Sequence, residues 1–489
     1  MPRTWVPIAS IYELDPNRPT PQLFLNQQYV CYQDQPSGQW IIMDDICPHR
    51  LAPLSEGRIN RNTETKISSI ISTSLQCSYH GWEYDGLNNG KCIGIPQISE
   101  QEKTALLSST SNSNRACVKS YSTIVHKNIL WFWPWKVDSL SILGQHKKYP
   151  EGMMESISIN AIPSTYTRDL PYGWDTLVEN LIDPAHIPFA HHNLQGKRKD
   201  AIPIYMSIPE SFSDTTVESF YFEWSDRTRG KHRGGTGEFN APYGVSYNAH
   251  YYDTKEEMLE KREKDDAGFK LGALCIPTKP GWSRAIIMAG PKEMKEKEMK
   301  KKKEKRKSLF GILFSIIPVW AIHLLSNKFL DSDLSFLHYQ EQERLRHIQD
   351  GRYDGGSNGY YMPAQSDRCI SALRKWIPKY TNYLGDGSPS NNKYELPNTI
   401  PRKELFDRYV QHTSHCRHCQ KGLKQIQTKI IPRLYGVMTI SILASGFNLF
   451  RGYKLVTKLI ALLSFGLIRL ITAKIEPAFK DGEFKHYEN

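Results

Sequence analysis

Two short loops, each carrying one cysteine and one histidine, restrict the fold of this chain most strongly. The first loop reads Cys47-Pro-His-Arg, and the second reads Cys77-Ser-Tyr-His-Gly-Trp. They are surrounded by short runs of β-forming residues and by Gly, Pro and Asp turns, which are typical of a small β domain. The sequence therefore predicts a β domain over residues 1–140 in which two thiolates and two imidazoles come together.

Two kinds of metal centre use such a ligand set. In a Rieske [2Fe–2S] cluster, cysteines bind one iron and histidines bind the other, so each loop would send one ligand to each iron. Zinc also binds cysteine and histidine, but the first loop is too short for the usual zinc-finger spacing. We therefore expect Cys47, His49, Cys77 and His80 to bind a Rieske cluster, with zinc as the alternative. Residues 50–76 are predicted to form a long hairpin between the loops.

A second group of ligand residues lies in residues 179–192, which read Glu-Asn-Leu-Ile-Asp-Pro-Ala-His-Ile-Pro-Phe-Ala-His-His. On a helix, Glu179, Asp183 and His186 would share one face, and a proline would let His191 turn back toward the same point. Two imidazoles and a carboxylate from elsewhere would form the facial triad of a non-haem Fe(II) oxygenase. The alternative is a polar helix end with surface histidines.

Asp333 is the best candidate for the missing carboxylate. It closely follows Asp331, which is expected to cap the start of a helix whose apolar residues recur at helical spacing from Leu334 to Ile348. The alternative for Asp333 is an acidic residue that the helix dipole favours in a first turn.

An apolar stretch, residues 309–325, directly precedes this helix and follows a lysine-rich run. By its length it is a candidate membrane span. A single span there would separate Asp333 from the two histidines by a membrane. We therefore expect the stretch to dip into the membrane interface or to pack on the catalytic domain, with Lys300–Lys307 on lipid head groups.

The tail carries a further thiol motif, His412-Thr-Ser-His-Cys-Arg-His-Cys419. Its cysteines, Cys416 and Cys419, have the spacing of a thiol–disulfide pair, which is the interpretation we favour. A metal site and two ordinary thiols are the alternatives.

Two apolar runs follow, residues 434–450 and 455–471, joined by a basic turn. Each is near the short end of a membrane-spanning helix. Arg433, Lys458 and Arg469 lie toward the ends of the runs, where long side chains can reach the membrane surface. The runs predict a helical hairpin that anchors the chain in a membrane, with a soluble buried hairpin as the alternative.

Composition narrows the class of function. The 63 basic and 51 acidic residues give a formal net charge of +12, but no nucleic-acid-binding motif is recognisable. Nine cysteines in 489 residues are not a disulfide framework and indicate a reducing compartment. The first residues show neither a signal-peptide core nor a transit segment, so we expect that the protein needs none or that the segment is missing.

Strand-like runs in the central part predict an antiparallel sheet. They cover residues 219–224, 243–252 and 285–289 and are rich in aromatic side chains. Such a sheet could form the floor of an apolar pocket. Residues 129–135 are the expected closing strand of the first domain, and residues 136–150 the linker that follows.

The order of these features resembles the pheophorbide a oxygenase group of Rieske oxygenases, found in chloroplasts and cyanobacteria. The resemblance covers nearly the whole chain and is most specific at Cys47–Arg58, Cys77–Trp82, Ile95–Gln97, Asp183–His192 and His412–Cys419. It implies an α+β fold of three parts: a Rieske domain over 1–140, a helix-grip antiparallel-sheet catalytic domain over 150–405 with a membrane-proximal insert at 292–326, and the C-x-x-C motif with a transmembrane helical hairpin over 406–489.

The resemblance also implies roles for single residues. Asp183 would bridge an iron-ligand histidine to a cluster histidine of the neighbouring subunit in a ring-shaped homotrimer. Cys416 and Cys419 would be the redox motif, with thioredoxin as a candidate partner. The implied metal ligands are Cys47, His49, Cys77 and His80 for the [2Fe–2S] cluster, and His186, His191 and Asp333 for a mononuclear Fe(II).

Members of this group take electrons from reduced ferredoxin and use O₂ to oxygenate tetrapyrroles, so we expect an enzyme of this kind, with opening of the pheophorbide a macrocycle as the leading reaction. Oxygenation of protochlorophyllide a or a phyllobilin is the alternative within the group. A non-enzymatic membrane redox or translocon-associated protein and a soluble ring-hydroxylating dioxygenase are alternatives outside it. The expected location is a thylakoid, inner-envelope or cyanobacterial membrane, with the soluble domains on the stromal or cytoplasmic side.

Overall fold

The computed structural model describes residues 3–63, 72–108, 114–135, 165–208, 219–254, 256–257, 269–290, 317–352, 359–380, 399–446 and 452–486. The chain forms two compact units. The first comprises Met1–Glu296 and Phe336–Thr399, and the second comprises Lys297–Ser335 and Ile400–Asn489. The domain boundaries inferred from the sequence stay a prediction.

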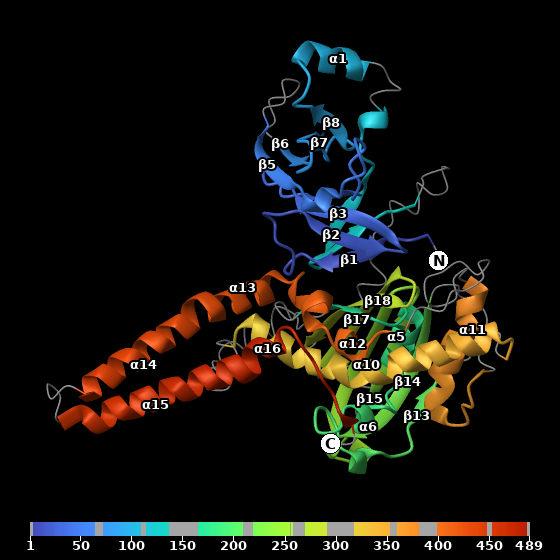
Figure 1. Ribbon diagram of the computed structural model, residues 1–489. Coiled ribbons are helices and arrows are strands. Elements are labelled where there is room, and N and C mark those ends of the chain that lie inside the picture. Colours follow the sequence, from blue (N-terminus) through green and yellow to red (C-terminus); the bar gives the residue numbers. More distant parts are fainter. Residues whose placement is uncertain are drawn as a thin grey trace, which may run out of the picture. The chain divides into compact units, whose positions relative to one another are not determined.

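The N-terminal part folds into three small antiparallel sheets (Figure 1). Their strand orders are β1-β11-β10, β2-β3-β4-β9 and β5-β6-β7-β8, which confirms the predicted β domain. The strands are β1 Val6–Ser10, β2 Thr20–Phe24, β3 Gln27–Gln33, β4 Trp40–Asp44, β5 Arg58–Thr63, β6 Ser72–Gln76, β7 Glu83–Asp85, β8 Lys91–Gly94, β9 Ser120–Tyr121, β10 Thr123–His126 and β11 Ile129–Phe132; the helix α1 covers Glu100–Ser108.

Of the hairpin predicted between the two ligand loops, the structure describes two paired strands, β5 and β6, and residues 64–71 between them lie outside the described part. The two strands pair in antiparallel register, with Arg58 opposite Gln76 and Ile59 opposite Leu75. The predicted closing strand is also confirmed, because β11 lies between β1 and β10. All four side chains of β11 are buried, so this strand is an interior one and not a solvent-facing edge. The predicted linker at 136–150 lies outside the described residues.

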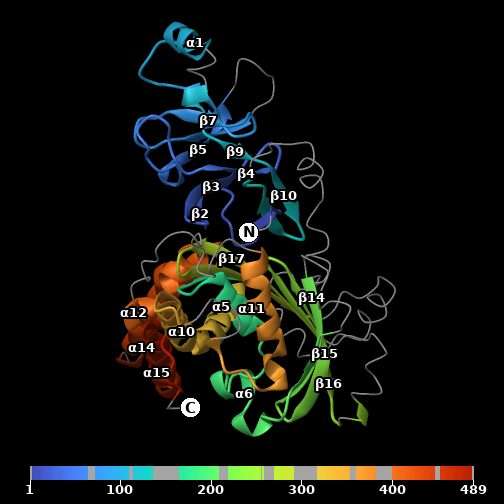
Figure 2. The same cartoon turned by 90° about the vertical axis from the view of Figure 1, so that its right-hand side faces the viewer.

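A seven-stranded antiparallel sheet follows, in the order β12-β18-β17-β16-β15-β14-β13 (Figure 2). Three of its strands confirm the runs predicted at 219–224, 243–252 and 285–289. Long alternation of apolar and polar residues in β14 places one face of that strand in the interior, as expected for an antiparallel sheet. The bounds are β12 Tyr166–Leu170, β13 Tyr205–Ser207, β14 Ser219–Thr228, β15 Lys231–Asn240, β16 Gly244–Tyr252, β17 Phe269–Lys279 and β18 Trp282–Gly290.

A common apolar core joins the N-terminal sheets to the large sheet within the first unit. Trp131 and Phe132 of β11 belong to the same buried cluster as Leu274 and Ile286 of β17 and β18. The ring of Phe24 contacts Phe132 edge to face, with ring centroids 5.9 Å apart. Full burial of such a side chain contributes roughly 1.5–3 kcal/mol to the free energy of folding. This core therefore holds the N-terminal sheets against the large sheet.

The first unit also contains three helices, which are α5 (Trp174–Leu181), α6 (Ile187–Ala190) and α11 (Arg368–Tyr380). A further helix, α10, runs without a break over Val319–Gln349. The prediction that Asp331 caps a helix start is wrong, because Asp331 lies well inside α10. An aspartate is stable there because its buried carboxylate pairs with Arg408, whose Nε lies 2.9 Å from Asp331 Oδ2. Of the apolar stretch 309–325, residues 309–316 lie outside the described part, and residues from Val319 onward form the first turns of α10.

The second unit ends in two helices that lie side by side (Figure 1). Helical residues run without a break from Arg417 to Gly446 and again from Lys454 to Ala478. The elements are α12 Arg402–Leu405, a π-helical turn at Tyr409–Thr413, α13 Arg417–Gln425, a π-helical turn at Ile426–Ile430, α14 Ile431–Gly446, α15 Lys454–Leu470, a π-helical turn at Ile471–Ile475 and α16 Glu476–Ala478.

These two helices carry their apolar side chains on the outside. Ile440, Leu455 and Leu462 are 68%, 81% and 67% exposed. The stretch Lys454–Ala478 has a mean hydropathy of 1.9 and is long and apolar enough to cross a membrane. Many apolar side chains of these two helices are therefore exposed in the structure.

Candidate iron centres

The two ligand loops share one backbone hydrogen-bond pattern although their Cys–His spacings differ. Leu51 N–H donates to the Cys47 carbonyl (2.8 Å), and Gly81 N–H donates to the Cys77 carbonyl (2.9 Å). The Cys47 N–H donates to the Ala52 carbonyl (2.9 Å), and the Cys77 N–H donates to the Trp82 carbonyl (2.8 Å). Leu51 and Gly81 both have a left-handed backbone, with φ of 60° and 76°. Both loops are therefore closed turns that present their side chains from a fixed backbone.

The side chains of the loops separate by type. Cys47 and Cys77 are fully buried. The rings of His49 and His80 lie next to each other, with centroids 4.5 Å apart, and His49 stacks on Trp82 at 4.7 Å. Two sulfurs inside and two imidazoles further out are the arrangement that a two-iron cluster requires.

The donor atoms of these loops suit metal ligands. Nδ1 of His49 is buried and has no hydrogen-bond partner within the described residues. Burial, helped by the nearby His80 and Arg50, lowers the pKa of His49, which favours the neutral, ligand form of the ring. The buried sulfurs and the more exposed imidazoles favour the cluster over zinc.

Sequence reasoning missed one residue beside the cluster site. The hydroxyl of Tyr84 lies 3.0 Å from Cys47 Sγ in the buried interior. Hydrogen bonds to the cluster sulfurs help to set the reduction potential of such a centre. Tyr84 belongs to no motif of the ligand loops, so only the pairing of β6 with β7 reveals it.

A pair of histidines faces each other beside α6. His186 Nε2 and His191 Nε2 are 3.2 Å apart. Two nitrogen ligands in adjacent positions of an octahedral ion, with bonds of about 2.1 Å, would be about 3.0 Å apart. The one-turn helix α6 separates the two residues, so the predicted turn of His191 back toward His186 is confirmed. The two imidazoles are thus arranged as neighbouring ligands of one metal.

Glu179, Asp183 and His186 do not lie on one helix. The helix α5 ends at Leu181, two residues before Asp183. Pro184 lacks a backbone N–H and disfavours the helical conformation at the residue before it, so the helix cannot continue into the motif.

Asp183 nevertheless contacts the histidine pair. Its Oδ2 lies 3.6 Å from His186 Nδ1, and its Oδ1 accepts the Ala185 N–H at 2.7 Å. A carboxylate on one ring nitrogen of a histidine fixes the ring and leaves the other nitrogen for the metal. Asp183 is therefore placed to orient His186, whose Nε2 faces His191.

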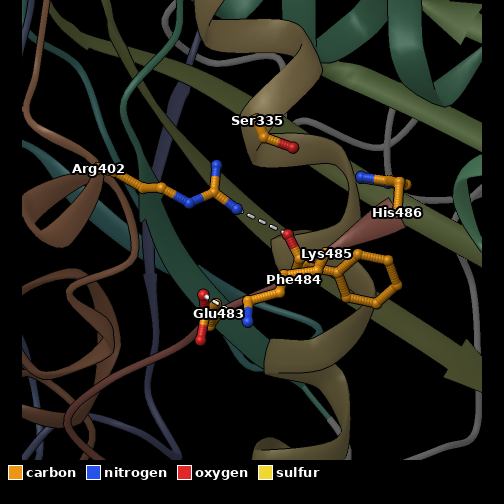
Figure 3. A pocket seen from close by; sticks show the side chains of 6 residues that line it. All are labelled: Ser335, Arg402, Glu483, Phe484, Lys485 and His486. Atoms are coloured by element: carbon orange, nitrogen blue, oxygen red, sulfur yellow. Dashed lines mark hydrogen bonds and ion pairs between the residues drawn. The ribbon is translucent and has the colours of Figure 1, made fainter. Parts of the chain in front are cut away.

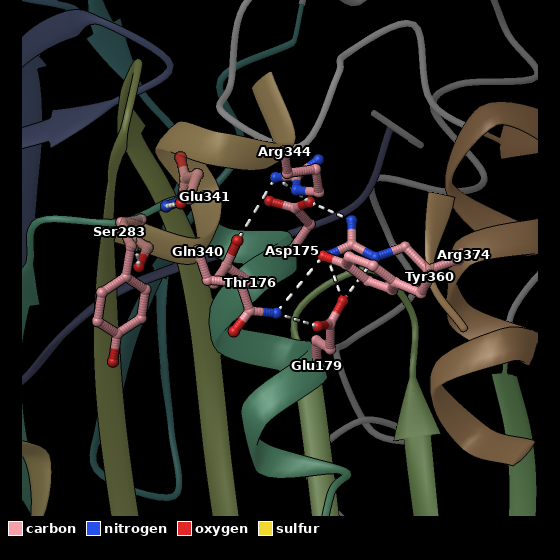
Figure 4. A network of polar contacts seen from close by, with 11 residues as sticks. Asp175, Thr176, Glu179, Ser283, Gln340, Glu341, Arg344, Tyr360 and Arg374 are labelled. Atoms are coloured by element: carbon pink, nitrogen blue, oxygen red, sulfur yellow. Dashed lines mark hydrogen bonds and ion pairs between the residues drawn. The ribbon is translucent and has the colours of Figure 1, made fainter. Parts of the chain in front are cut away.

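A buried polar network fixes α5, the helix that leads into this motif (Figure 4). Asp175 Oδ2 lies 2.9 Å from Arg344 Nη2 and 2.5 Å from Arg374 Nη1. Glu179 Oε2 accepts from Arg374 Nε at 2.6 Å, and Glu179 Oε1 accepts from Gln340 at 3.0 Å. Glu179 therefore joins α5 to α10 and α11 and is not near the facing nitrogens.

The remaining predicted site residues lie in the second unit. Asp333 is on α10, and its side chain is buried. Cys416 and Cys419 form no disulfide bond, and both are fully buried. Burial opposes ionisation of Cys416, but hydrogen bonds with Cys419, His323 and His412 outweigh it and hold its pKa well below the usual value.

A pocket of about 250 Å³ lies in the second unit between α10, α12 and the end of the chain (Figure 3). Arg402 Nη2 donates to the Phe484 carbonyl at 2.8 Å across it. Its lining residues are Ser335, Arg402, Glu483, Phe484, Lys485 and His486. None of the predicted metal ligands is among them, so we assign no reaction to this pocket.

The N-terminal β domain with its two ligand loops, joined to an antiparallel sheet domain that presents a histidine pair, defines a Rieske-type iron protein. In agreement, residues 4–121 match the Rieske [2Fe-2S] domain family, and residues 239–350 match the Pheophorbide a oxygenase family.

Curated relatives extend the match over most of the chain. Pheophorbide a oxygenase of Oryza sativa subsp. japonica is 31% identical over 434 residues, covering 87% of this chain and 73% of the relative. Protochlorophyllide-dependent translocon component 52 of Arabidopsis thaliana is also 31% identical, and flavonoid 8-hydroxylase 2 of Ocimum basilicum is 29% identical. Each of these two matches covers 86% of this chain and 73% of the relative. All three are chloroplastic proteins. The chain belongs to the pheophorbide a oxygenase family of Rieske oxygenases.

Proposed function

We propose that the chain is an oxygenase that takes electrons from reduced ferredoxin and uses O₂ to oxygenate a chlorophyll-derived tetrapyrrole. The observation that carries the proposal is the pair of facing nitrogens of His186 and His191, 3.2 Å apart, in a chain that also has the two Rieske loops. A protein that only carries electrons needs the Rieske loops but does not need the histidine pair.

Cys47, His49, Cys77 and His80 would hold the [2Fe–2S] cluster, and His186, His191 and Asp333 would hold a ferrous ion. When bound, the cluster would supply single electrons, and the ferrous ion would activate O₂. The side chain of Asp333 is buried on α10, and a carboxylate is the third ligand type of the facial triad that the histidine pair would begin.

The substrate we propose first is pheophorbide a, with opening of its macrocycle as the reaction. The rice relative carries that name, but a relative of equal identity is named for protochlorophyllide and a third for a flavonoid. Family membership therefore does not select the substrate, and the alternative proposal is oxygenation of protochlorophyllide a or a phyllobilin.

We also propose that α14 and α15 form a hairpin that anchors the chain in a chloroplast membrane. The apolar side chains of these helices face outward, and in water such a surface would be unfavourable. The chloroplastic relatives support the organelle, and the soluble parts would then lie on the stromal side, where ferredoxin is available. A chain with a net charge of +12 would suit an acidic donor.

The test uses the full chain in detergent with both metal sites loaded, reduced ferredoxin and ¹⁸O₂. We expect O₂ uptake and a labelled product with pheophorbide a, and no product with His186→Ala. His192→Ala is the matched control, because the His192 ring accepts the Arg198 N–H and takes no part in the facing pair. Absence of a product from both pheophorbide a and protochlorophyllide a, a product from a flavone alone, or full activity of His186→Ala would refute the proposal.

A further inference from the structure

Four buried donor atoms of the second unit meet at one point outside the iron centres. They belong to His323, His412, Cys416 and Cys419, and all of them lie within 4.8 Å of one another. Each of the four side chains is at most 1% exposed. His323 comes from the first turns of α10, and the other three come from the turn before α13 and from α13 itself.

We propose that these four residues form a structural zinc site that fastens the start of α10 to the base of the α14–α15 helix pair. The motif of Cys416 and Cys419 was compatible with a metal site from sequence alone, but His323 was not foreseen. The site is independent of the oxygenase reaction.

The distances between the donor atoms support a tetrahedral ion. A zinc ion with bonds of about 2.0–2.1 Å to nitrogen and about 2.3 Å to sulfur separates two nitrogens by about 3.3 Å and a nitrogen from a sulfur by about 3.6 Å. Here His323 Nδ1 and His412 Nε2 are 3.1 Å apart, and Cys416 Sγ lies 3.5 Å from His323 Nδ1. Cys419 Sγ lies 3.2 Å from His412 Nε2 and 3.6 Å from His323 Nδ1.

The chemistry of the donor set favours zinc in particular. Two thiolates with two imidazoles are a frequent ligand set of structural zinc, and all four coordination positions are then filled. The histidine pair of the iron centre differs, because an oxygenase site must keep positions open. A filled site of this kind would contribute stability and not catalysis.

The surroundings of the four residues suit a structural role. Leu423, Ile426, Ile471 and Phe479 pack with the two cysteines in one apolar cluster, against which Trp320 of α10 also lies. A Cβ atom on Gly422 would come within 2.6 Å of the Trp320 ring, so α13 and α10 approach closely here. The metal would thus lie where three separate parts of the second unit meet.

Full burial also separates this proposal from a regulatory thiol pair. Thiol–disulfide exchange with a protein partner needs access to at least one sulfur. Both cysteines have no exposed surface, so a thioredoxin-like protein could reach them only after the unit opens.

Metal analysis of the full chain, purified in detergent without added zinc or chelator, tests the site. We expect about one zinc per chain in addition to iron. Cys416→Ser and His323→Ala should each lower the zinc content at least about tenfold and leave the cluster spectrum unchanged. His415→Ala, in the same motif but outside the ligand set, should keep its zinc.

A second measurement does not depend on the folding of variants. In the native wild-type chain, Cys416 and Cys419 should resist alkylation until a chelator removes zinc, and cobalt(II) added to the zinc-free chain should give the visible absorption of a tetrahedral thiolate site. A disulfide between the two cysteines in the purified chain would overturn the proposal. So would iron in place of zinc, or zinc that His186→Ala removes and Cys416→Ser does not.

Discussion

At His186, the two ring nitrogens face different groups. Nδ1 lies beside the carboxylate of Asp183, and Nε2 lies beside His191. A carboxylate beside one ring nitrogen of a histidine favours the tautomer whose opposite nitrogen can bind a metal. We therefore propose that Asp183 positions His186 within its own chain.

Asp183→Asn removes the charge but can still accept the Ala185 N–H, so the local turn is retained. We expect iron affinity at the mononuclear site, and the oxygenation rate with it, to fall about 10–100-fold, as other losses of such carboxylates do. Iron titration of the apo site, followed by O₂ uptake, measures both quantities. An unchanged iron affinity would show that the carboxylate does not act through His186.

Motif spacing predicted the cluster loops and the histidine pair because those ligands are close in sequence. The cysteines and histidines of each loop lie within four residues of one another. His323 could not be predicted in this way, since it lies 89 positions before His412 and belongs to no motif. Tyr84 was missed for a similar reason, because strand pairing and not spacing brings it to Cys47.

Among the elements, α5 is held by buried charge. Burial disfavours the ionised form of Asp175, but Arg344 and Arg374 outweigh it and lower the pKa of the carboxyl. Removing one partner from such a buried network leaves the others uncompensated. The network therefore holds the helix that leads into the histidine motif.

Asp175→Asn should destabilise the first unit by about 3–5 kcal/mol at pH 7. Folding lowers the pKa of Asp175. The ionised carboxylate therefore contributes its full stabilisation above the unfolded pKa of about 3.9, and this stabilisation is lost as the pH falls through the folded pKa. In thermal unfolding, the variant and the wild type should differ in free energy of unfolding by a constant amount between pH 5 and 8. This difference should shrink only below about pH 4.

Glu343→Gln is the matched control for this variant. Glu343 pairs with Arg346 on the exposed side of α10, where both side chains are about half exposed. Such a surface pair contributes about 0–1 kcal/mol. Equal destabilisation by the two substitutions would contradict the role of the buried network.

The helix α10 shows why tertiary contacts limit sequence-based prediction. Aspartate is a poor residue for a helix interior and a good helix cap, so local preference places a helix start at Asp331. The buried pair with Arg408 reverses that preference, because it compensates the charge of the carboxylate inside the helix. Arg408 is 77 positions away, so this compensation is not visible in the local sequence.

The outward apolar faces of α14 and α15 give a second prediction at this scale. Leu462→Lys would place a charge on a lipid-facing position and should weaken membrane insertion by about 2.5–3.5 kcal/mol. Carbonate extraction of membranes carrying the variant measures the released fraction. Leu106→Lys on α1, also a partly exposed leucine, should leave the chain in the membrane fraction. Equal retention of both variants would argue against a lipid-facing α15.

On the scale of the whole molecule, the tips of the cluster loops carry exposed apolar side chains. Leu51 is 74% exposed and lies two positions after His49, and Tyr79 is 64% exposed and directly precedes His80. Apolar side chains at an exposed functional edge favour contact with another protein surface. From the family resemblance together with these exposed side chains, we propose a homotrimer in which each cluster serves the mononuclear iron of its neighbour.

A mixed assembly tests that arrangement. Chains with His49→Ala lack the cluster, chains with His186→Ala lack the mononuclear iron, and each should be inactive alone. Co-expressed in one cell, they should recover a measurable part of the wild-type rate, because an intact cluster can adjoin an intact iron of another chain. No recovery from assemblies shown by native mass spectrometry to contain both chains would contradict electron transfer between subunits.

The central claim is that one chain holds two separate iron centres. Iron and sulfide analysis of an anaerobically prepared sample, combined with electron paramagnetic resonance of the reduced protein, tests it most directly. The account predicts about three irons and two sulfides per chain with a histidine-ligated cluster signal, and about two irons with an unchanged signal in His186→Ala. Two irons in wild type and the same two in His186→Ala, or no such cluster signal, would contradict it.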